Sequence, residues 1–185
     1  MKLHRLSTAF LATCLLLVCS QGQAEVTVTG DVSPSGATDP WEINSNLFVG
    51  NTGEGTLNVE AGGVVSMTLL HSGGYIGYDD DSVGTVTVTG EGSEWINLMD
   101  LYVGNYGEGT LNIMAGGVVS NRWSQIGFRS GSVGTVTVTG EGSEWNNSSK
   151  LYVGHFGEGT LNIEGYGDAF RATPRIGPDA EYTVR

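Results

Sequence analysis

The stretch LYVGNYGEGTLNI, residues 101–113, occurs three times in this chain with small changes. The other two copies are LFVGNTGEGTLNV at 47–59 and LYVGHFGEGTLNI at 151–163. In the closing GTLNI, apolar side chains alternate with threonine or asparagine, a period of two that predicts a half-buried β-strand. The glycines before it allow the backbone to turn with positive φ. Each copy therefore predicts a glycine-rich bend followed by a strand.

A related phrase lies between these copies, as YIGYDDDSVGTVTV at 75–88 and QIGFRSGSVGTVTV at 125–138. It has the same order of apolar residue, glycine, bend and alternating strand. The threonine that opens each strand recurs at intervals of 29, 25, 25 and 25 residues, and the longest interval contains a four-residue insertion near 68–74. Short strands, glycine bends and this period predict an all-β fold, a parallel β-helix (β-solenoid) of about six rungs with about 25 residues per rung and a double-rung repeat of about 50 residues.

Stacked rungs would place equivalent residues above one another and bury a continuous core. The alternation predicts two inward columns, Leu57, Val86, Leu111, Val136, Leu161 and Val59, Val88, Ile113, Val138, Ile163. We expect three tryptophans to pack at corners, in the loops between phrases: Trp41, Trp95 and Trp145. The expected domain is 25–185, with rungs near 26–63, 75–92, 101–117, 125–142 and 151–167 and an incomplete last rung at 175–185.

The first 24 residues have the pattern of a secretory signal peptide. Lys2 and Arg5 give a basic start, an apolar run covers 9–18, and small residues at 22 and 24 suit cleavage before Glu25. The apolar run has about ten residues, half of the roughly twenty that a membrane-spanning helix needs. The sequence therefore predicts a signal peptide at 1–24, no membrane-spanning segment in the mature chain, and export to the cell surface, the medium or the periplasm.

Both cysteines of the chain, Cys14 and Cys19, lie in this segment. A lipid anchor on one of them is the alternative to cleavage, but bacterial lipoproteins have a small residue just before that cysteine, and here Thr13 and Val18 precede them. After cleavage the mature chain has no cysteine and therefore no disulfide. Small exported domains usually depend on disulfides, so the repeats must supply the stability.

The mature chain is strongly acidic. Without the signal peptide it has six basic and twenty acidic residues, a net charge of −14, and Lys150 is its only lysine. Such a surface repels phosphate backbones and anionic lipid headgroups. We therefore expect no nucleic-acid partner, and a surface polysaccharide or a protein as the ligand.

The two phrases together resemble a known family. LYVGxxGEGTLNI followed by GSVGTVTVTGEGSEW is similar to the autotransporter-associated repeat, also called the PEP-CTERM-associated repeat, and the resemblance covers nearly all of residues 26–185. It implies a β-solenoid passenger displayed at, or released from, a bacterial cell surface. The family has no shared catalytic residues to carry over.

Carboxylates and histidines were considered as catalytic groups. The glutamates recur with the repeat, whereas an active site is needed once, so periodic recurrence favours a structural role over the paired-carboxylate chemistry of glycoside cleavage. His71 and His155 have no partner nearby in sequence for nucleophilic or zinc chemistry. We expect no catalytic site, no cofactor and no enzymatic activity. The recurring glutamates are Glu54, Glu108, Glu158, Glu91, Glu94, Glu141 and Glu144.

Asp79, Asp80 and Asp81 form an acidic run that occurs once, where the sister copy has Arg129-Ser130-Gly131. Three carboxylates at a bend could supply oxygen ligands to calcium. The alternative is a solvated acidic corner, and the run does not match the glycine-aspartate repeat of calcium-binding β-rolls.

The strands also predict an outward array of short polar side chains, two residues wide on five rungs. Such arrays resemble the ice-facing surface of some solenoid ice-binding proteins, although threonine is also simply a good strand former. The array consists of Thr56, Asn58, Thr85, Thr87, Thr110, Asn112, Thr135, Thr137, Thr160 and Asn162.

These patterns favour a non-enzymatic exported repeat protein that acts as a structural or adhesive module. The alternatives are an ice-binding protein and a polysaccharide-binding or polysaccharide-cleaving β-helix protein. The last rung begins at 175–177 and ends within the strand at 183–184, with no capping element visible. Uncovered strand edges template pairing, which predicts end-to-end self-association that salt strengthens by screening the charge of −14.

Overall fold

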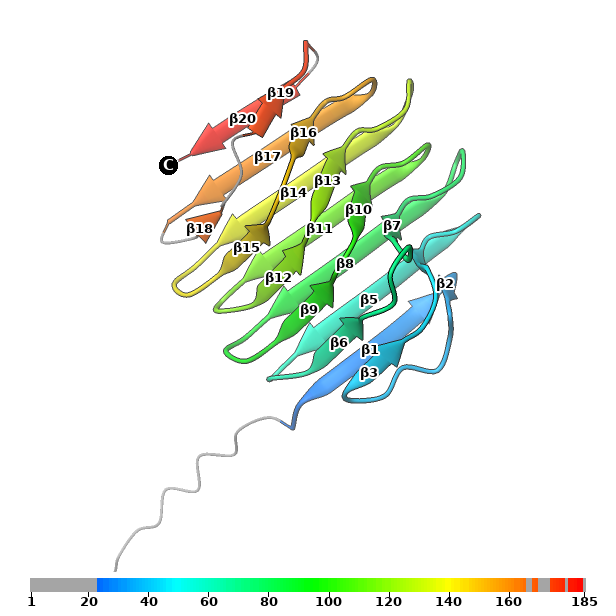
Figure 1. The fold of residues 1–185 in the computed structure, drawn as a ribbon, viewed down its shortest axis with the longest axis vertical. Coiled ribbons are helices and arrows are strands. Elements are labelled where there is room, and N and C mark those ends of the chain that lie inside the picture. The colour runs from blue at the N-terminus through cyan, green and yellow to red at the C-terminus, as the bar shows by residue number, and fades with distance from the viewer. Residues whose placement is uncertain (1–22, 166–167, 170–173, 179, 185) are drawn as a thin grey trace, which may run out of the picture.

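The structure is a computed structural model that describes residues 23–165, 168–169, 174–178 and 180–184. These residues form an all-β solenoid of stacked parallel turns (Figure 1). The predicted fold class is therefore confirmed. Most of the predicted signal peptide lies outside the described residues. The described residues contain no helix that is long and apolar enough to cross a membrane.

Three sheets run the length of the stack, each taking one strand from every turn. Sheet A contains the long strands β1 (Glu25–Gly30), β5 (Glu54–Glu60), β8 (Val83–Thr89), β11 (Glu108–Met114), β14 (Val133–Thr139), β17 (Glu158–Glu164) and β20 (Ala180–Val184). Sheet B contains β2 (Val32–Ser33), β4 (Leu47–Val49), β7 (Gly74–Ile76), β10 (Asp100–Val103), β13 (Trp123–Ile126), β16 (Leu151–Val153) and β19 (Pro174–Ile176). Sheet C contains β3 (Trp41–Ile43), β6 (Val64–Met67), β9 (Glu94–Asn97), β12 (Val118–Asn121), β15 (Glu144–Asn147) and β18 (Asp168–Ala169).

Each turn passes through sheet C, then sheet B, then sheet A. Five turns, from β3–β4–β5 to β15–β16–β17, are described in full, and β18, β19 and β20 belong to a sixth. In Figure 1 the short strands of sheets C and B lie in front of the long strands of sheet A. Apart from the first (26–63), the complete rungs predicted from sequence, such as 101–117, contain only the B and A strands, because the sheet C strands between them were expected to be loop.

The inward columns of sheet A are buried as predicted. Leu111 and its equivalents are 0% exposed, and in the second column only Ile163 keeps any exposure, at 5%. The strands pair in exact register, so that Leu111 lies between Val86 and Val136. Identical stretches recur in the sequence because every turn stacks on an equivalent turn about 4.8 Å away.

The three tryptophans expected at corners, Trp41, Trp95 and Trp145, lie on strands of sheet C and not in loops. Trp95 and Trp145 are 0% exposed and point into the core. They are paired in register with small residues of the intervening turns, Trp95 with Val65 and Trp145 with Val119. In sheet B, a Cβ atom on Gly74 would lie 2.9 Å from Cζ2 of Trp95. The indole therefore fills space that small residues leave free.

This alternation of large and small residues explains the double-rung repeat. Along sheet C the inward residues are Trp41, Val65, Trp95, Val119 and Trp145, and along sheet B they are Leu47, Gly74, Leu101, Ser124 and Leu151. In these two columns, each turn with a tryptophan and a leucine thus stacks on turns that have a smaller side chain at the same positions, whereas the larger Met67, Ile76 and Ile126 of those turns lie elsewhere in the core. A repeat of one turn would place two indoles about 4.8 Å apart, which a close-packed core of this size does not accommodate.

Three buried asparagines continue the core of sheet C where the chain bends toward sheet B. Asn97, Asn121 and Asn147 are at most 4% exposed. The amide of Asn121 donates to the carbonyl oxygen of Trp123 at 2.8 Å, and its oxygen accepts from Nε1 of Trp145 at 2.9 Å. Asn97 likewise donates to the carbonyl oxygen of Asp100. Asn97 and Asn121 thus satisfy polar groups that the bend buries, whereas Nδ2 of Asn147 and Nε1 of Trp95 are buried without a hydrogen-bond partner among the described residues.

Buried serines and glycines close the corners. Ser143 Oγ donates to the carbonyl oxygen of Thr139 at 2.7 Å and accepts from the amide of Gly116 in the turn below. Ser93 makes the equivalent pair of bonds one repeat earlier. At the bend between sheets B and A, Gly104 has φ 72°, and a Cβ there would collide with the carbonyl oxygen of Val133. The bend therefore requires glycine.

The N-terminal end of the stack differs from the predicted first rung. β1 and β2 run antiparallel to β5 and β4, so residues 25–33 fold over the first parallel turn instead of forming part of it. The carboxylate of Asp31 accepts hydrogen bonds from the amides of Thr52 (2.6 Å) and Gly53 (2.9 Å) in the first sheet B–sheet A bend. At the other end, β18, β19 and β20 are the last strands of their sheets among the described residues. End-to-end association stays a prediction.

We predict that Val136→Asp destabilises the fold by about 3–5 kcal/mol, because it places an unpaired carboxylate in the core. The matched control is Thr137→Asp, the next residue of β14, which points outward and should cost less than about 1 kcal/mol. Denaturant unfolding of both variants measures the difference. Equal stability of the two variants would contradict the assigned inward face.

We also predict that the contribution of Asp31 to stability depends on pH. Hydrogen bonds, first from the amide of Thr52, hold the pKa of this carboxyl below its usual range although burial opposes them. A carboxyl with a lower pKa in the folded state stabilises it above the unfolded pKa of about 3.9, and that contribution is lost as the pH falls through the folded value.

The isosteric Asp31→Asn variant tests this prediction. It should lower the melting temperature at pH 7, and the difference from the unmodified protein should begin to shrink near pH 3.9 and disappear only below the lowered pKa of the folded state. Other carboxyls titrate in both proteins alike, so the difference between the two melting curves isolates Asp31. A difference that stays constant down to pH 2.5 would argue against the charge of Asp31 as the cause.

Candidate ligand-binding faces

The outer face of sheet A carries the predicted array of threonine and asparagine. The ladder places Thr56, Thr85, Thr110, Thr135 and Thr160 in one column, and Asn58, Thr87, Asn112, Thr137 and Asn162 in the next. All ten side chains are half-buried by their neighbours. Equivalent hydroxyl groups thus repeat about every 4.8 Å along the stack.

Two further threonines extend this array at its N-terminal end. In β1, Thr29 pairs with Thr56, and Thr27 pairs with Asn58. Sequence reasoning missed them because β1 runs antiparallel to the other strands. The signal was present nonetheless, since residues 26–30 repeat the VTVTG of 86–90 and 136–140.

The border at the start of the sheet A strands is charged at every second turn, whereas the border at their ends has glutamate only at Glu60 and Glu164. One border column reads Glu54, Val83, Glu108, Val133 and Glu158, and all five residues are exposed. Carboxylates two turns apart are separated by about 9.6 Å, twice the strand spacing, a distance over which salt screens much of their repulsion. The recurring glutamates therefore alternate with an apolar residue and do not meet as a catalytic pair on this face.

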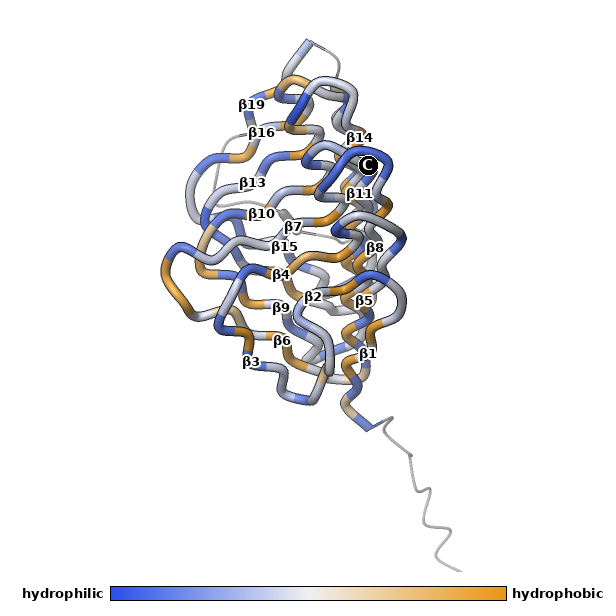
Figure 2. Tube along the Cα trace, turned by 90° about the vertical axis from the view of Figure 1, so that its right-hand side faces the viewer, coloured by the Kyte–Doolittle hydropathy of each residue, from blue (hydrophilic) through white to orange (hydrophobic). Residues whose placement is uncertain are grey.

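Sheet B carries a ladder of aromatic rings on its outer face, which the sequence analysis did not recognise. Figure 2 shows the strands of this sheet one above another. Phe48, Tyr75 and Tyr102 stack with centroids 5.1 and 5.0 Å apart and nearly parallel planes. The contacts continue through the residues of the adjoining bends, and we call the whole set the aromatic ladder: Phe48, Tyr75, Tyr78, Tyr102, Phe128, Tyr152, His155 and Phe156.

Polar groups interrupt the aromatic ladder at Gln125. Its Oε1 lies 2.7 Å from Nδ1 of His155, and its side chain also hydrogen-bonds Tyr102. Burial is the main cause that raises the pKa of both Tyr75 and Tyr102, so their hydroxyl groups remain neutral at physiological pH. Because the stacked rings cover one another's faces, this part of the sheet presents ring edges and hydroxyl groups to a ligand.

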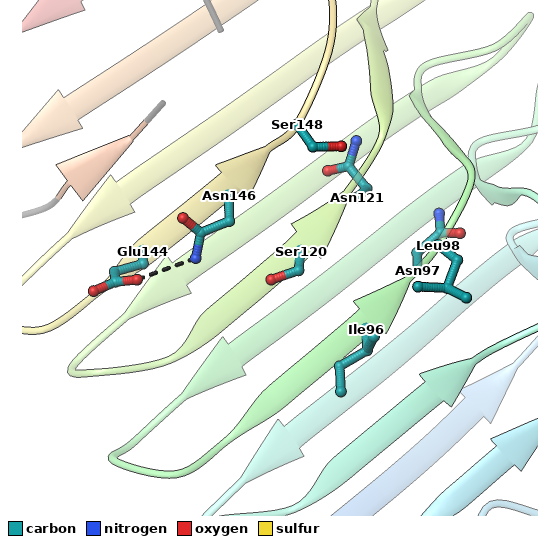
Figure 3. Close-up of a pocket in the computed structure, with 8 residues that line it drawn as sticks. All are labelled: Ile96, Asn97, Leu98, Ser120, Asn121, Glu144, Asn146 and Ser148. Atoms are coloured by element: carbon teal, nitrogen blue, oxygen red, sulfur yellow. Dashed lines mark hydrogen bonds between the residues drawn. The ribbon is translucent and has the colours of Figure 1, made fainter. Parts of the chain in front are cut away.

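A shallow groove of about 400 Å³ lies over sheet C, across β9, β12 and β15 (Figure 3). It is lined by Ile96, Asn97, Leu98, Ser120, Asn121, Glu144, Asn146 and Ser148. Glu144 is the one carboxylate of this lining, and its Oε2 accepts a hydrogen bond from Asn146 at 3.1 Å. The groove offers hydrogen-bonding groups suited to hydroxyl-rich ligands. Glycoside cleavage uses two carboxyl groups, and the lining of this groove provides one.

The aspartates of the acidic run, Asp79, Asp80 and Asp81, are all exposed at the bend between β7 and β8. Within the described part of the chain, no three histidine, cysteine, aspartate or glutamate side chains gather where they could hold a metal ion. Calcium binding at this run stays a prediction. His71 lies exposed in the insertion between β6 and β7, whereas His155 belongs to the aromatic ladder.

Comparison of the chain with protein-family models, with curated proteins and with solved structures finds no match in any of the three. The resemblance to the autotransporter-associated repeat therefore rests on the sequence motifs alone.

Proposed function

We propose that this chain is a non-enzymatic exported repeat protein that acts at the cell surface, or outside the cell, as a rigid structural and adhesive module. The observation that supports it best is the periodicity of two of the three outer faces. Sheet A repeats hydroxyl and amide groups over the six strands β1, β5, β8, β11, β14 and β17, and sheet B repeats aromatic rings over five turns, with Gln125 in place of a ring on β13. A ligand that matches such faces is itself extended and repetitive, as a polysaccharide is.

The core supports the rigid part of this role. Stacked columns without a break from β5 to β17 leave no internal hinge in the described turns. The charge of −14 on the mature chain opposes adhesion to anionic lipid and keeps the module soluble. Adhesion is then expected to come from specific faces of the solenoid.

Binding to polysaccharides tests this proposal. We expect the mature chain to co-sediment with, or shift in affinity electrophoresis on, at least one member of a panel of surface polysaccharides, and to release no reducing ends or unsaturated sugars during prolonged incubation. Heat-unfolded protein is the control for nonspecific adsorption. Release of sugar fragments would replace the adhesive function with an enzymatic one. Binding to none of the polymers in the panel would count against adhesion.

The threonine columns of sheet A favour ice binding as a second candidate. If ice is the ligand, the mature chain should inhibit ice recrystallisation, and Thr110→Tyr in the centre of the array should abolish this effect. The outward Tyr102→Phe on sheet B should leave the effect intact. The absence of inhibition in the unmodified protein would remove this candidate.

A further inference from the structure

The basic side chains that the structure describes gather on one face of this acidic protein. In the described part of the chain, lysine and arginine occur at Arg122, Arg129, Lys150 and Arg175. Each of these four cations lies over an aromatic ring on or beside the outer face of sheet B. We define the basic–aromatic patch as these four cations together with Trp123 and Tyr152.

Two of the four cations, Lys150 and Arg122, lie over the ring of Trp123. Nζ of Lys150 lies 5.0 Å from the ring centroid of Trp123, and the guanidinium of Arg122 lies 5.6 Å from the centroid of the same ring. Nε1 of Trp123 donates to Ser149 Oγ at 2.9 Å, which fixes the orientation of the indole. Trp123 itself remains half-exposed.

The other two cations lie toward the bend and the last strand. The guanidinium of Arg129 lies 4.4 Å from the ring centroid of Phe128 and 5.4 Å from that of Tyr106, and Arg175 lies 6.0 Å from the ring of Tyr152. Phe156, beside them, is 64% exposed. Apolar rings and fixed positive charges therefore alternate over this half of the sheet.

Carboxylates also lie near the patch, and three of them, Asp79–Asp81, belong to the same column of bends as Arg129, two turns away. Asp100 pairs with Arg122 at 3.1 Å and lies in register with Trp123. The recurring glutamates lie elsewhere, at the border of sheet A and at the corner between sheets A and C. Lys150, Arg129 and Arg175 form no ion pair within 4.0 Å among the described residues. The patch thus has an uncompensated positive charge on a protein that is otherwise negative.

We propose that the basic–aromatic patch binds an acidic polysaccharide, a chain of uronic acid residues. The apolar face of a sugar ring packs on exposed aromatic surface such as Phe156, which is 64% exposed, and the cations bind the sugar carboxylates. The four cations come from three successive turns about 4.8 Å apart, so one linear polymer of charged sugars can contact several of them. The inference rests on the proposed adhesive function and names its ligand class.

Charge density favours a polyuronate over nucleic acid. Duplex DNA carries one charge per about 1.7 Å of axis, and the net charge of −14 repels so dense a polyanion beyond the small patch. A polyuronate carries one charge per sugar and offers apolar ring faces as well. Both features of the patch, its rings and its cations, then contribute to binding.

The test compares polygalacturonate with its fully methyl-esterified form, which has the same sugar rings without charge. We expect the mature chain to bind polygalacturonate in low salt, to bind the ester at least about tenfold more weakly, and to lose affinity as salt screens the patch. Poly-L-glutamate and duplex DNA serve as probes with charge but no matching sugar surface, and both should bind more weakly than polygalacturonate.

Variants assign the binding to the patch. Arg129→Gln and Lys150→Gln should each weaken polygalacturonate binding about two- to fivefold, the loss expected for an exposed charge contact, and together about tenfold. Glu141→Gln, at the corner between sheets A and C, is the control and should bind as the unmodified protein does. The melting temperatures of all variants should stay close to that of the unmodified protein.

Several results would overturn the inference. Equal binding of polygalacturonate and its ester, equal binding of poly-L-glutamate, tighter binding of DNA, or full affinity in the double variant would each do so. Binding of a neutral polysaccharide without binding of polygalacturonate would overturn this inference and leave the proposed adhesive function intact. Cleavage of polygalacturonate would contradict the proposed non-enzymatic function. The binding measurements on the Arg129→Gln and Lys150→Gln variants would still decide whether the patch binds the polymer.

Discussion

The stacking of equivalent side chains from turn to turn is the constraint on which the rest of this structure depends. A turn of the solenoid has no core of its own, because its inward residues are covered only by the turns on either side. Strand pairing fixes these turns about 4.8 Å apart, so each inward residue must fit the residue directly above and below it. The alternation of Trp95 with Val65 and Val119 is one solution to this requirement.

The same constraint governs polar and charged residues. If every turn had a glutamate at the same position, neighbouring carboxylates would repel one another at the strand spacing. In the column of Glu54, Glu108 and Glu158, a valine lies between successive glutamates. Asn97, Asn121 and Asn147 occupy consecutive turns at the inner end of sheet C, where the two-turn alternation is absent. Asn97 and Asn121 bond the chain around the bend and not one another, because Asn97 donates to the carbonyl oxygen of Asp100 and Asn121 to that of Trp123.

Much of the fold could be predicted from the sequence because strand alternation and glycine bends are local signals. The inward columns through Leu111 and Ile113 follow from a period of two, and the register follows from the conserved spacing of the repeat within the chain. Sheet C was missed because its strands are short and dissimilar between turns: VVSM at 64–67 and EWIN at 94–97 share no residue. Only the three-dimensional turn shows that Val65 and Trp95 are equivalent.

The candidate binding faces also differ in whether they could be predicted from the sequence. The threonine array could be predicted because it is the other half of the strand alternation. The aromatic ladder and the basic–aromatic patch could not, because they join residues from a strand, a bend and the turn above, such as Tyr152, His155 and Phe128. Contacts of this kind depend on the three-dimensional path of each bend between two sheets.

The three faces differ in how strictly the core determines them. On sheet A the outward residues alternate directly with core residues in long strands, and the polar array is nearly uniform. On sheet B the strands are short and bends adjoin them, so outward residues vary from turn to turn, as Gln125 does between Tyr102 and Tyr152. Outward residues that can vary without disturbing the core are the positions at which a repeat protein can acquire a specific ligand. The uneven distribution of its few cations onto sheet B therefore points to this face, more than to the regular array of sheet A, as the place where one ligand is distinguished from another.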